Sequence, residues 1–501
     1  MTTRPLYRIA ALRTIEQTAL ALLPAGTLMQ RAGKATAEIA LALLGTRIAD
    51  ASVLILAGPG NNGGDALEAA THLAAAGAQV DVLLLLAPAG QPADAVQALA
   101  RARTTSITFV DRLQPRAYSL VLDGLFGIGL TRSIDGALRL LVEQVNQLDC
   151  PILALDVPSG LDADSGMVIG ADGVAIRATH TITFIGDKPG LHTGAGRDYA
   201  GQVALASLDL DLTQRAPSPI QLNGPGLFGS AVHRRVHDSH KGSFGDVAVL
   251  GGADGMTGAV LLAARAALHC GAGRVYAAFV GAPLSHDALY PELMCRQVSQ
   301  IELGKAVLVV GPGLGATRAS KECLMRVFQS SATLVLDADA LNLIAAEPGL
   351  IKNVARHRAP LLMTPHPLEA ARLLNRSAAA VQADRLNAAT ELAQQCDAVV
   401  VLKGSGTVIA HPDGALVINP TGNPALATGG TGDVLAGVCG ALLAQGWPVW
   451  EAALGAVWLH GRAADRLVQH GVGPIGMFAS ELLPHIRHEL NQLKPVVPPR
   501  L

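Results

Sequence analysis

The sequence predicts an α/β protein with two three-layer domains, each built on a mainly parallel sheet with helices on both faces. Three observations support this fold class. The chain has 501 residues, more than a single compact core usually serves. Half of its residues are hydrophobic but only 3% are aromatic, so small and aliphatic side chains must fill the layers. Short apolar runs alternate with helical patterns along the chain, which is the order of βαβ units.

Composition argues against several classes of function. The formal net charge is −2 and no basic block occurs, so nucleic acid is a poor candidate partner. The longest apolar run, around residues 82–86, is too short to span a bilayer, and the N-terminus shows no signal-peptide core. We therefore expect a cytoplasmic protein with no membrane partner. The six cysteines lack CxxC spacing, which favours reduced, buried thiols over a zinc site or a disulfide framework.

The first βαβ unit carries a glycine-rich loop that also holds asparagines. Helices are expected within residues 14–44, and the strand at 53–56 runs directly into Gly-Pro-Gly-Asn-Asn-Gly-Gly-Asp at 58–65. A helix to about residue 76 and a strand at 80–86 complete the unit. Ligands collect at the carboxyl ends of such strands, and amide and carboxylate oxygens suit hydroxyls or a hard cation as well as phosphate. The loop predicts a polar ligand site; the alternative is a purely structural turn.

Two further strands of the first half end in aspartates. Asp123 is followed by Gly-Leu-Phe-Gly-Ile-Gly-Leu, and Asp156 is followed by Val-Pro-Ser-Gly-Leu-Asp. A strand-terminal Asp often only caps a loop, but two of them should share one edge of a parallel sheet with the asparagine-glycine loop. Together they indicate a polar site. Lys188, which follows a strand at 178–184, would by itself be a solvated surface lysine.

These motifs together resemble the NAD(P)H-hydrate epimerase domain, a Rossmann-like fold that interconverts the R and S forms of hydrated NADH and NADPH. The resemblance covers about residues 10–212 and rests on GNNGGD, DGLFGIGL, ALDVPSGLDADSG and DKPGL. It implies that Asp156 and Lys188 transfer protons at the nicotinamide ring. One departure is Glu68, in Ala-Leu-Glu where the family often has Gly-Leu-Val; we expect it to alter substrate binding and not the fold. The resemblance further implies a K⁺ site of Asn62, Asp123 and Ser159, and a hydrate site of Asn61, Asn62, Gly63, Gly64, Asp65, Gly127, Ile128, Gly129, Leu130, Thr131, Arg132, Ser133 and Asp156.

A connector separates the two halves. Residues 208–212 alternate apolar and acidic side chains and are expected to form a final edge strand. The proline-bearing stretch that follows lacks apolar periodicity, which is typical of a short linker. The expected domains are therefore 1–212 and 225–501, joined by a linker at 213–224.

In the second half, each predicted strand runs into a loop with glycine or polar residues. Strands are expected at 247–250, 275–279, 307–310, 334–336, 361–363 and 399–402, with a buried helix at 258–270. Because parallel strands share a carboxyl edge, these loops should converge on one rim. The chemically active side chains expected on that rim are those of Asp337, Asp339, His366, Lys403, Thr407 and Asp433.

The sequence Gly-Gly-Thr-Gly-Asp at 429–433 opens a predicted helix that runs to about residue 445. Unpaired amides at a helix N-terminus attract an anion such as phosphate, and Asp433 beside it is suited to act as a base. The alternative is a glycine turn in which Asp433 only favours the first helical turn. Walker A, protein-kinase and nucleophile-elbow signatures do not occur. His366, flanked by two prolines, would more often be structural when considered alone.

The rim resembles that of the ribokinase-like superfamily, and within it the ADP-dependent NAD(P)H-hydrate dehydratase, over about residues 225–492. The motifs are KGSFGDVAVLGG, GAGRV, GPGLG, LDADALN, TPHPLEAARLL, VVLKGSGTVIA and ATGGTGDVLAG. Two departures, Met256 where an aromatic is common and Leu368 where HPGE has glycine, are expected to reshape the pocket slightly. The resemblance implies contacts of the hydrate with Ala259, Gly313, His366 and Asp433, and of the Mg²⁺-bound adenine nucleotide with Lys403, Gly404, Ser405, Gly406, Thr407 and Gly432.

The two resemblances together imply a bifunctional repair enzyme with NADHX, NADPHX and ADP as small-molecule partners. Phosphorylation would turn the hydroxyl of the hydrate, a poor leaving group, into phosphate, which leaves readily; residues alone do not exclude ATP as the donor. We also expect a homo-oligomer. The rival functions are a vitamin or sugar kinase on the same scaffold and a non-catalytic nucleotide sensor.

Overall fold

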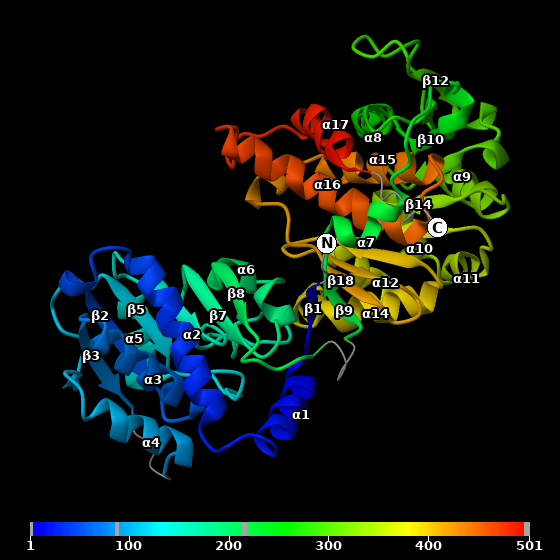
Figure 1. The fold of residues 1–501 in the computed structure, drawn as a ribbon. Coiled ribbons are helices and arrows are strands. Elements are labelled where there is room, and N and C mark those ends of the chain that lie inside the picture. The colour runs from blue at the N-terminus through cyan, green and yellow to red at the C-terminus, as the bar shows by residue number, and fades with distance from the viewer. Residues whose placement is uncertain (1–3, 86–89, 213–217, 495–501) are drawn as a thin grey trace, which may run out of the picture. The chain divides into compact units, whose positions relative to one another are not determined.

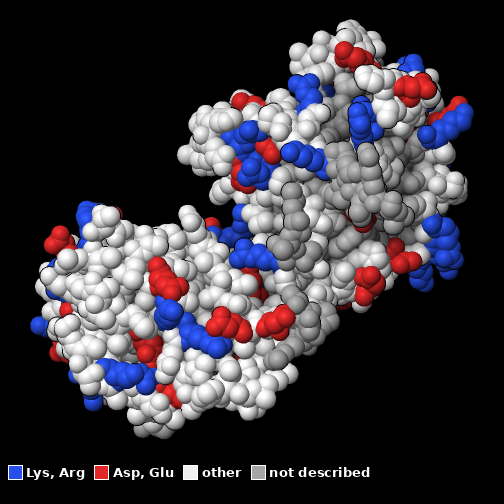
Figure 2. All heavy atoms as spheres, in the orientation of Figure 1, with Lys and Arg blue, Asp and Glu red and all other residues white. Residues whose placement is uncertain are grey.

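The computed structural model of the chain describes residues 4–85, 90–212 and 218–494, which belong to two compact units (Figure 1). Residues 5–220 belong to the first unit, and Arg4 belongs with the residues from Gln221 onward to the second. Residues 213–217 of the expected linker lie outside the described residues, and residues 220–222 form a strand of the second sheet. Within the described ranges, no helix combines the length and hydrophobicity that a membrane span needs. Figure 2 shows acidic and basic side chains interspersed over the visible surface.

The first unit contains a seven-stranded parallel sheet in the order β4-β3-β2-β5-β6-β7-β8. Chain order reverses between β2 and β5, so the loops after these strands open a crevice at the carboxyl edge where ligands bind in such sheets. The strands are β2 (Ser52–Ala57), β3 (Gln79–Leu84), β4 (Thr108–Val110), β5 (Leu120–Gly124), β6 (Ile152–Leu155), β7 (His180–Phe184) and β8 (Gln202–Ala206).

Helices bury both faces of this sheet, as the sequence predicts. Val53 and Ile55 pack in one core with α1 to α4, whereas Leu54 and Leu56 pack in another with α5. This alternation follows from the two-residue period of a strand. The helices are α1 (Ile9–Leu20), α2 (Thr27–Leu44), α3 (Asn61–Ala75), α4 (Ala93–Ala102), α5 (Gly136–Val145) and α6 (Gly196–Tyr199).

The edge strand expected at residues 208–212 is wrong. The edge is β8, and the chain turns after it, with φ of 53° at Leu208 and 57° at Asp209. Arg31 fixes this turn by donating to the Leu208 carbonyl oxygen at 2.8 Å and pairing with the Asp209 carboxylate at 3.4 Å. The alternating leucines therefore pack against the core from this turn, and they do not belong to a hydrogen-bonded β-strand.

The second sheet has eleven strands in the order β1-β9-β18-β17-β16-β15-β14-β13-β10-β11-β12. Its centre from β16 to β12 is parallel, and β17 and β18 are antiparallel additions. The strands are β1 (Arg4–Leu6), β9 (Ile220–Leu222), β10 (Asp246–Gly251), β11 (Arg274–Phe279), β12 (Met294–Gln297), β13 (Val307–Val310), β14 (Leu334–Leu336), β15 (Leu361–Met363), β16 (Val399–Leu402), β17 (Val408–Ala410) and β18 (Leu416–Ile418).

One face of this sheet packs on α8, α15, α16 and α17 in a single core, and α14 packs on β16. Helix α15 is buried along almost its whole length against α8, so its N-terminus is rigidly placed at the carboxyl edge. The helices are α7 (Pro225–Phe228), α8 (Thr257–His269), α9 (Arg318–Phe328), α10 (Ala338–Ala346), α11 (Pro348–Arg356), α12 (Pro367–Leu373), α13 (Ala378–Ala383), α14 (Arg385–Cys396), α15 (Thr431–Ala444), α16 (Val449–Gln469) and α17 (Leu482–Gln492).

Candidate active sites

A cavity of about 550 Å³ opens in the first unit at the carboxyl ends of β2 and β5. Gly63, Gly64 and Ser133 are not among its described lining residues. A Cβ on Gly63 would lie 1.9 Å from the Gly58 carbonyl oxygen, and one on Gly64 would lie 2.5 Å from Met29, so both glycines allow α3 to pack closely. The predicted residues that do line the cavity are Asn61, Asn62, Asp65, Gly127, Ile128, Gly129, Leu130, Thr131, Arg132, Asp156 and Lys188.

Asp123 at the end of β5 and Ser159 in the loop after β6 form a buried oxygen-rich cluster. The Ser159 hydroxyl donates to Asp123 Oδ1 at 2.6 Å, and the Ser159 amide donates to Oδ2 at 2.8 Å. Burial raises the pKa of Asp123 to about 6. Asn62 lies on the adjacent first turn of α3, and its buried side-chain oxygen and nitrogen have no hydrogen-bond partner among the described residues. A buried amide without a partner is costly, which indicates a ligand.

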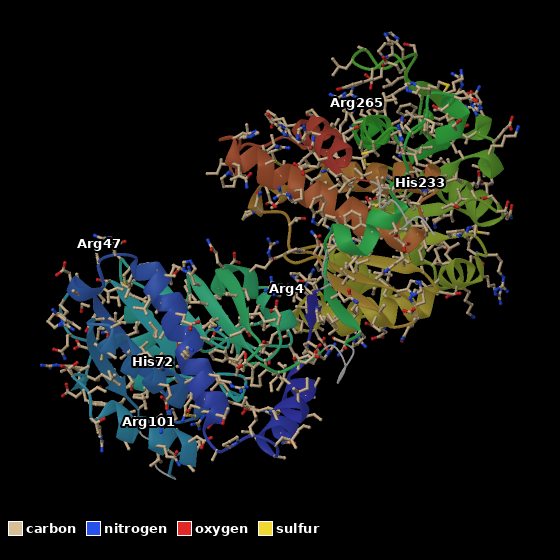
Figure 3. The ribbon with its side chains drawn as sticks, viewed as in Figure 1. Arg4, Arg47, His72, Arg101, His233 and Arg265 are labelled. Carbon is tan, nitrogen blue, oxygen red and sulfur yellow. The ribbon has the colours of Figure 1, made fainter. Side chains whose placement is uncertain are left out.

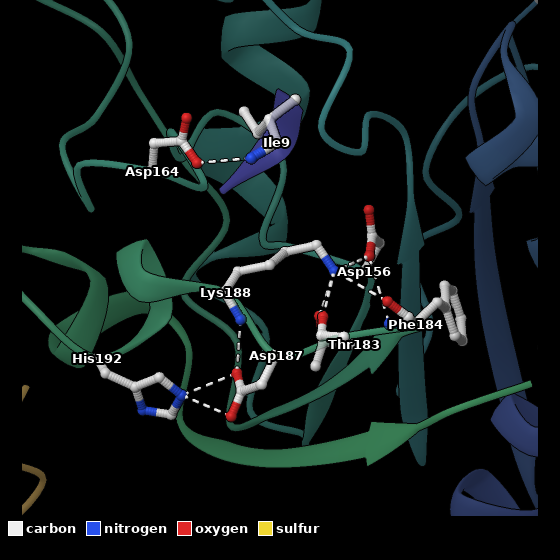
Figure 4. Close-up of polar contacts among 9 residues, drawn as sticks. Ile9, Asp156, Asp164, Thr183, Phe184, Asp187, Lys188 and His192 are labelled. Carbon is white, nitrogen blue, oxygen red and sulfur yellow. Dashed lines mark hydrogen bonds and ion pairs between the residues drawn. The ribbon is translucent and has the colours of Figure 1, made fainter. Parts of the chain in front are cut away.

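Asp156 and Lys188 form an ion pair at the cavity wall (Figure 4). Lys188 is 1% exposed, and its ammonium lies 2.7 Å from Asp156 Oδ1. It also donates to Thr183 Oγ1 at 2.7 Å and to the carbonyl oxygens of Phe184 and Gly186 at 3.2 and 3.1 Å. Four acceptors thus surround three N–H groups. The ammonium is therefore fixed against Asp156.

The backbone around this pair is also constrained. Asp156 has a φ of 67°, a left-handed conformation uncommon for a residue with a Cβ. Asp187 fixes the start of the lysine loop by accepting from the Lys188 amide at 2.8 Å and from His192 Nε2 at 2.9 Å (Figure 4). In the sequence, only the resemblance indicates a role for Lys188; the structure shows that Lys188 is buried and not a solvated surface lysine.

Two acidic residues of the cavity wall interact electrostatically with Asp156. Burial, and then the charge of Asp156, raises the pKa of Asp65 well above its usual value. Glu16 on α1 also lines the cavity, and burial together with Asp156 raises its pKa. Glu16 was missed because its helix carries no motif. The cavity therefore presents several carboxyl groups that compete for protons.

Glu68 does not reach this cavity, contrary to the expectation that it would alter substrate binding. It is buried between α3 and α4, where Arg101 Nε donates to its carboxylate at 2.9 Å (Arg101 is labelled in Figure 3). Gly33 on α2 packs directly over its Cβ. The substitution is therefore accommodated by an ion pair between helices.

The second site begins at the N-terminus of α15. Gly430, with a φ of 89°, is its N-cap, and the Thr431 hydroxyl donates to the carbonyl oxygens of Leu426 and Thr428, both at 2.9 Å. Asp433 lies in the first turn. Burial raises its pKa to about 7, the charges of Asp337 and Asp339 add to this, and Lys403 opposes it. A carboxyl group with this pKa beside an anion-binding helix end is suited to proton transfer.

Lys403 lies beside this helix end. Its ammonium is 2.6 Å from Asp337 Oδ1 and would lie 3.5 Å from a Cβ on Gly432. Asp337 is 1% exposed and accepts a second bond from Thr364 Oγ1 at 2.8 Å. The loops after β14, β15 and β16 are thus linked through side chains.

The turn Lys403–Thr407 joins β16 to the antiparallel β17. Gly404 has a φ of 136° and lies over the Arg385 guanidinium. Arg385, buried at the start of α14, donates to the carbonyl oxygens of Leu402 and Lys403, both at 3.2 Å. This support fixes a backbone that would approach a nucleotide. Arg385 was not predicted, because nothing in the sequence of its helix distinguishes it from a surface arginine.

His366 has a definite structural role. It is the N-cap of α12, and its Nδ1 accepts from the amides of Leu368 and Glu369 at 3.1 and 3.2 Å. The proton of the neutral ring therefore lies on Nε2, which is 3.3 Å from Glu369 Oε1. Burial lowers the pKa of His366 and raises that of Glu369 to about 7. Contact of His366 with substrate stays a prediction.

Gly313 and Ala259 lie next to each other. Gly313 has a φ of 57°, and a Cβ at this position would lie 2.5 Å from the Met256 carbonyl oxygen and 3.3 Å from Ala259 Cβ. Met256 and Leu368, the two departures from the family pattern, are 40% and 46% exposed. Their side chains are free to meet a ligand or solvent.

Comparison with known proteins identifies the family. A family model described as NAD(P)H-hydrate dehydratase matches residues 247–487, and one described as YjeF-related protein N-terminus matches residues 25–190. The bifunctional NAD(P)H-hydrate repair enzyme of Coxiella burnetii is 37% identical over 486 residues, covering 93% of this chain and 94% of the relative. That of Escherichia coli is 39% identical over 452 residues, with 87% and 85% covered.

The chain belongs to the family of bifunctional NAD(P)H-hydrate repair enzymes. Both resemblances found from the residues are confirmed, as is the α/β fold class with a mainly parallel sheet in each half. Among solved structures, the ADP/ATP-dependent NAD(P)H-hydrate dehydratase of Bacillus subtilis, co-crystallised with ATP and Mg²⁺, is 30% identical to the part it matches. It covers 54% of this chain and 98% of its own length with a TM-score of 0.48.

Proposed function

We propose that this chain repairs hydrated NADH and NADPH in two steps. The first unit interconverts the R and S hydrates, and the second dehydrates the S form at the expense of ADP. The observation that carries the second step is Asp433, a carboxyl with a pKa of about 7 at the amide-bearing end of α15, next to the Lys403 ammonium. A base, an anion hole and a cation are the parts that phosphoryl transfer needs.

In the dehydration, Asp433 takes the proton of the hydrate hydroxyl while that oxygen attacks the terminal phosphorus of ADP. The bond from phosphorus to the AMP oxygen breaks. The lone pair of the ring nitrogen then expels inorganic phosphate, and loss of a proton from the neighbouring ring carbon restores NAD(P)H. The amides of residues 429–432 hold the charge that develops on the phosphoryl group.

Mg²⁺ fits the second site, because Asp337 and Asp339 at the start of α10 bring carboxylate oxygens, which this cation prefers, to the edge of the sheet that holds the N-terminus of α15. Asp339 would face it, and it would neutralise charge on the nucleotide phosphates. The nucleotide itself would rest on Lys403 to Thr407 and Gly432. The hydrate would contact Ala259, Gly313, His366 and Asp433.

K⁺ fits the first site. The buried Asn62 side chain lacks a partner among the described residues, and Asp123 and Ser159 supply further oxygen atoms. These three residues would hold the ion, which would fix the loop that carries the hydrate. Asp156 would exchange the proton at the ring, and Lys188 would act through its ion pair with Asp156.

One assay tests both activities. Mixed epimers are incubated with ADP or ATP, with and without K⁺, and recovery of the NADH absorbance band is followed. We expect complete recovery with ADP, and recovery of only the S fraction when the first site is inactivated by Asp156→Asn. A stable phosphorylated alcohol without NADH would favour the kinase alternative, and nucleotide binding without turnover would favour the sensor.

We also propose that the protein is cytoplasmic and forms a homo-oligomer. Fractionation of cells that express the tagged chain tests the first point. Light scattering coupled to size-exclusion chromatography tests the second, and a mass of one chain would contradict it.

A further inference from the structure

We propose that Asp337 is the residue that positions the Lys403 ammonium against the transferred phosphoryl group of the nucleotide. The inference rests on the proposed dehydration, and it assigns a role to Asp337 that neither motif matching nor the resemblance provides. Asp337 occupies the N-cap position of a helix, but its side chain does not cap that helix.

Asp337 is the N-cap residue of α10, where aspartate is among the preferred residues because its carboxylate can accept from the helix amides. Its side chain makes no such bond. Instead, Oδ1 accepts from Lys403 Nζ at 2.6 Å and from Thr364 Oγ1 at 2.8 Å. The carboxylate therefore binds side chains from the neighbouring strands and does not stabilise the N-terminus of α10.

The three residues come from consecutive strands of the sheet. Asp337 follows β14, Thr364 follows β15 and Lys403 follows β16, so the lysine chain reaches across the end of β15. Thr364 is fully buried and Asp337 nearly so, whereas the Lys403 side chain is 20% exposed. The anchor is thus rigid, and the ammonium keeps access to a ligand.

The ammonium faces the first turn of α15. It would lie 3.5 Å from a Cβ on Gly432, whose backbone belongs to the anion-binding helix end. Burial alone would lower the pKa of Lys403, but the carboxyl groups of Asp337, Glu369 and Asp433 together raise it. A lysine that stays charged next to unpaired helix amides forms a site for a dianionic phosphoryl group.

The alternative is that the pair only ties two loops together. A buried ion pair is weak evidence for stability, since apolar replacements are often equally stable. If the pair only joined two loops, the position of the ammonium at the N-terminus of α15 would have no function. The two interpretations predict different results when the charge and its anchor are removed separately.

The first measurement does not depend on turnover. Calorimetric dissociation constants for ADP and AMP are compared in the wild type, Lys403→Met and Asp337→Asn. If the ammonium binds the terminal phosphoryl group, the wild type should bind ADP about ten-fold more tightly than AMP, as one charge-assisted contact allows. The preference should fall to about three-fold in Asp337→Asn and further still in Lys403→Met, where only the helix amides remain to bind the terminal phosphoryl group. Equal preferences in all three proteins would overturn the proposal.

The second measurement is the pH profile of dehydration. Since Asp337 raises the pKa of Asp433 and Lys403 lowers it, the acidic limb should move to lower pH in Asp337→Asn and to higher pH in Lys403→Met. The kcat of both variants should fall at least ten-fold, whereas Asp337→Glu should recover part of it. Shifts in the same direction, or no shift, would contradict the assignment.

Two controls separate folding from function. Asp246→Asn breaks a surface ion pair with Arg274 in the same unit and should change neither nucleotide preference nor kcat. Thr364→Val removes the hydroxyl bond to Asp337 without changing charge, and it should lower kcat in the same direction as Asp337→Asn but less. Turnover by the wild type tests the proposed function. The ratios of variant to wild type in kcat and in ADP preference test the role of Asp337, so one proposal can fail while the other holds. Unchanged kcat in Thr364→Val and Asp337→Asn would refute the positioning role.

Discussion

The pH dependence of dehydration follows from the surroundings of Asp433. A base must be ionised to accept the hydroxyl proton, so the rate should fall as pH drops through its pKa of about 7. The ionised fraction is then about 0.1 at pH 6 and about 0.9 at pH 8, which predicts a roughly ten-fold rise between these values. An ordinary aspartate would be fully ionised throughout this range, and its profile would be flat.

The assay is the rate of NADH recovery from the purified S hydrate with saturating ADP, measured between pH 5.5 and 8.5. Asp433→Asn should lose dehydration by at least a hundred-fold at all pH values and keep epimerisation, which the same preparation reports. Spontaneous decay of the hydrate is subtracted from an enzyme-free sample at each pH. A flat wild-type profile between pH 6 and 8, or full activity of Asp433→Asn, would refute the assignment of Asp433 as the base.

Three further predictions concern the first unit. Asn62→Leu should abolish the stimulation of epimerisation by K⁺; stimulation that persists in a potassium titration would contradict the proposed cation site. Lys188→Met should leave the Asp156 carboxylate, which is only 13% exposed, without its counter-charge and lower the free energy of unfolding by about 3 kcal/mol in urea titration. The double variant with Asp156→Asn should regain most of that stability and remain inactive as an epimerase. Glu68→Gln should keep the KM of epimerisation within about two-fold, because Glu68 contacts Arg101 and not the cavity; a larger change in KM would restore the original expectation.

The central strands could be predicted from the sequence because burial on both faces makes them continuous apolar runs. The expected bounds 307–310, 334–336 and 361–363 coincide with β13, β14 and β15. Edge elements were harder to predict, since their pairing depends on partners distant in the chain. Strand β1 joins β9, and the β17–β18 hairpin was not expected.

The loops that carry the sites were predicted for a related reason: each follows a recognisable strand, and parallel strands place their loops on one edge. The direction of a side chain within a loop was not predictable. Glu68 faces Arg101, Glu16 faces the cavity and Asp337 faces Lys403, and each of these orientations depends on helices or strands that only the folded chain brings together.

The two units use a lysine–aspartate pair in different ways, and the difference suits the two reactions. In the first unit Lys188 contacts Asp156 itself, the proposed proton carrier, at 2.7 Å. In the second unit Lys403 contacts Asp337, and Asp433 stands apart with a pKa of about 7. A lysine bound directly to Asp433 would hold it as a carboxylate of low basicity. Placing that lysine on Asp337 leaves Asp433 basic enough to take a hydroxyl proton near neutral pH, and it keeps a cation beside the helix end where phosphate charge develops.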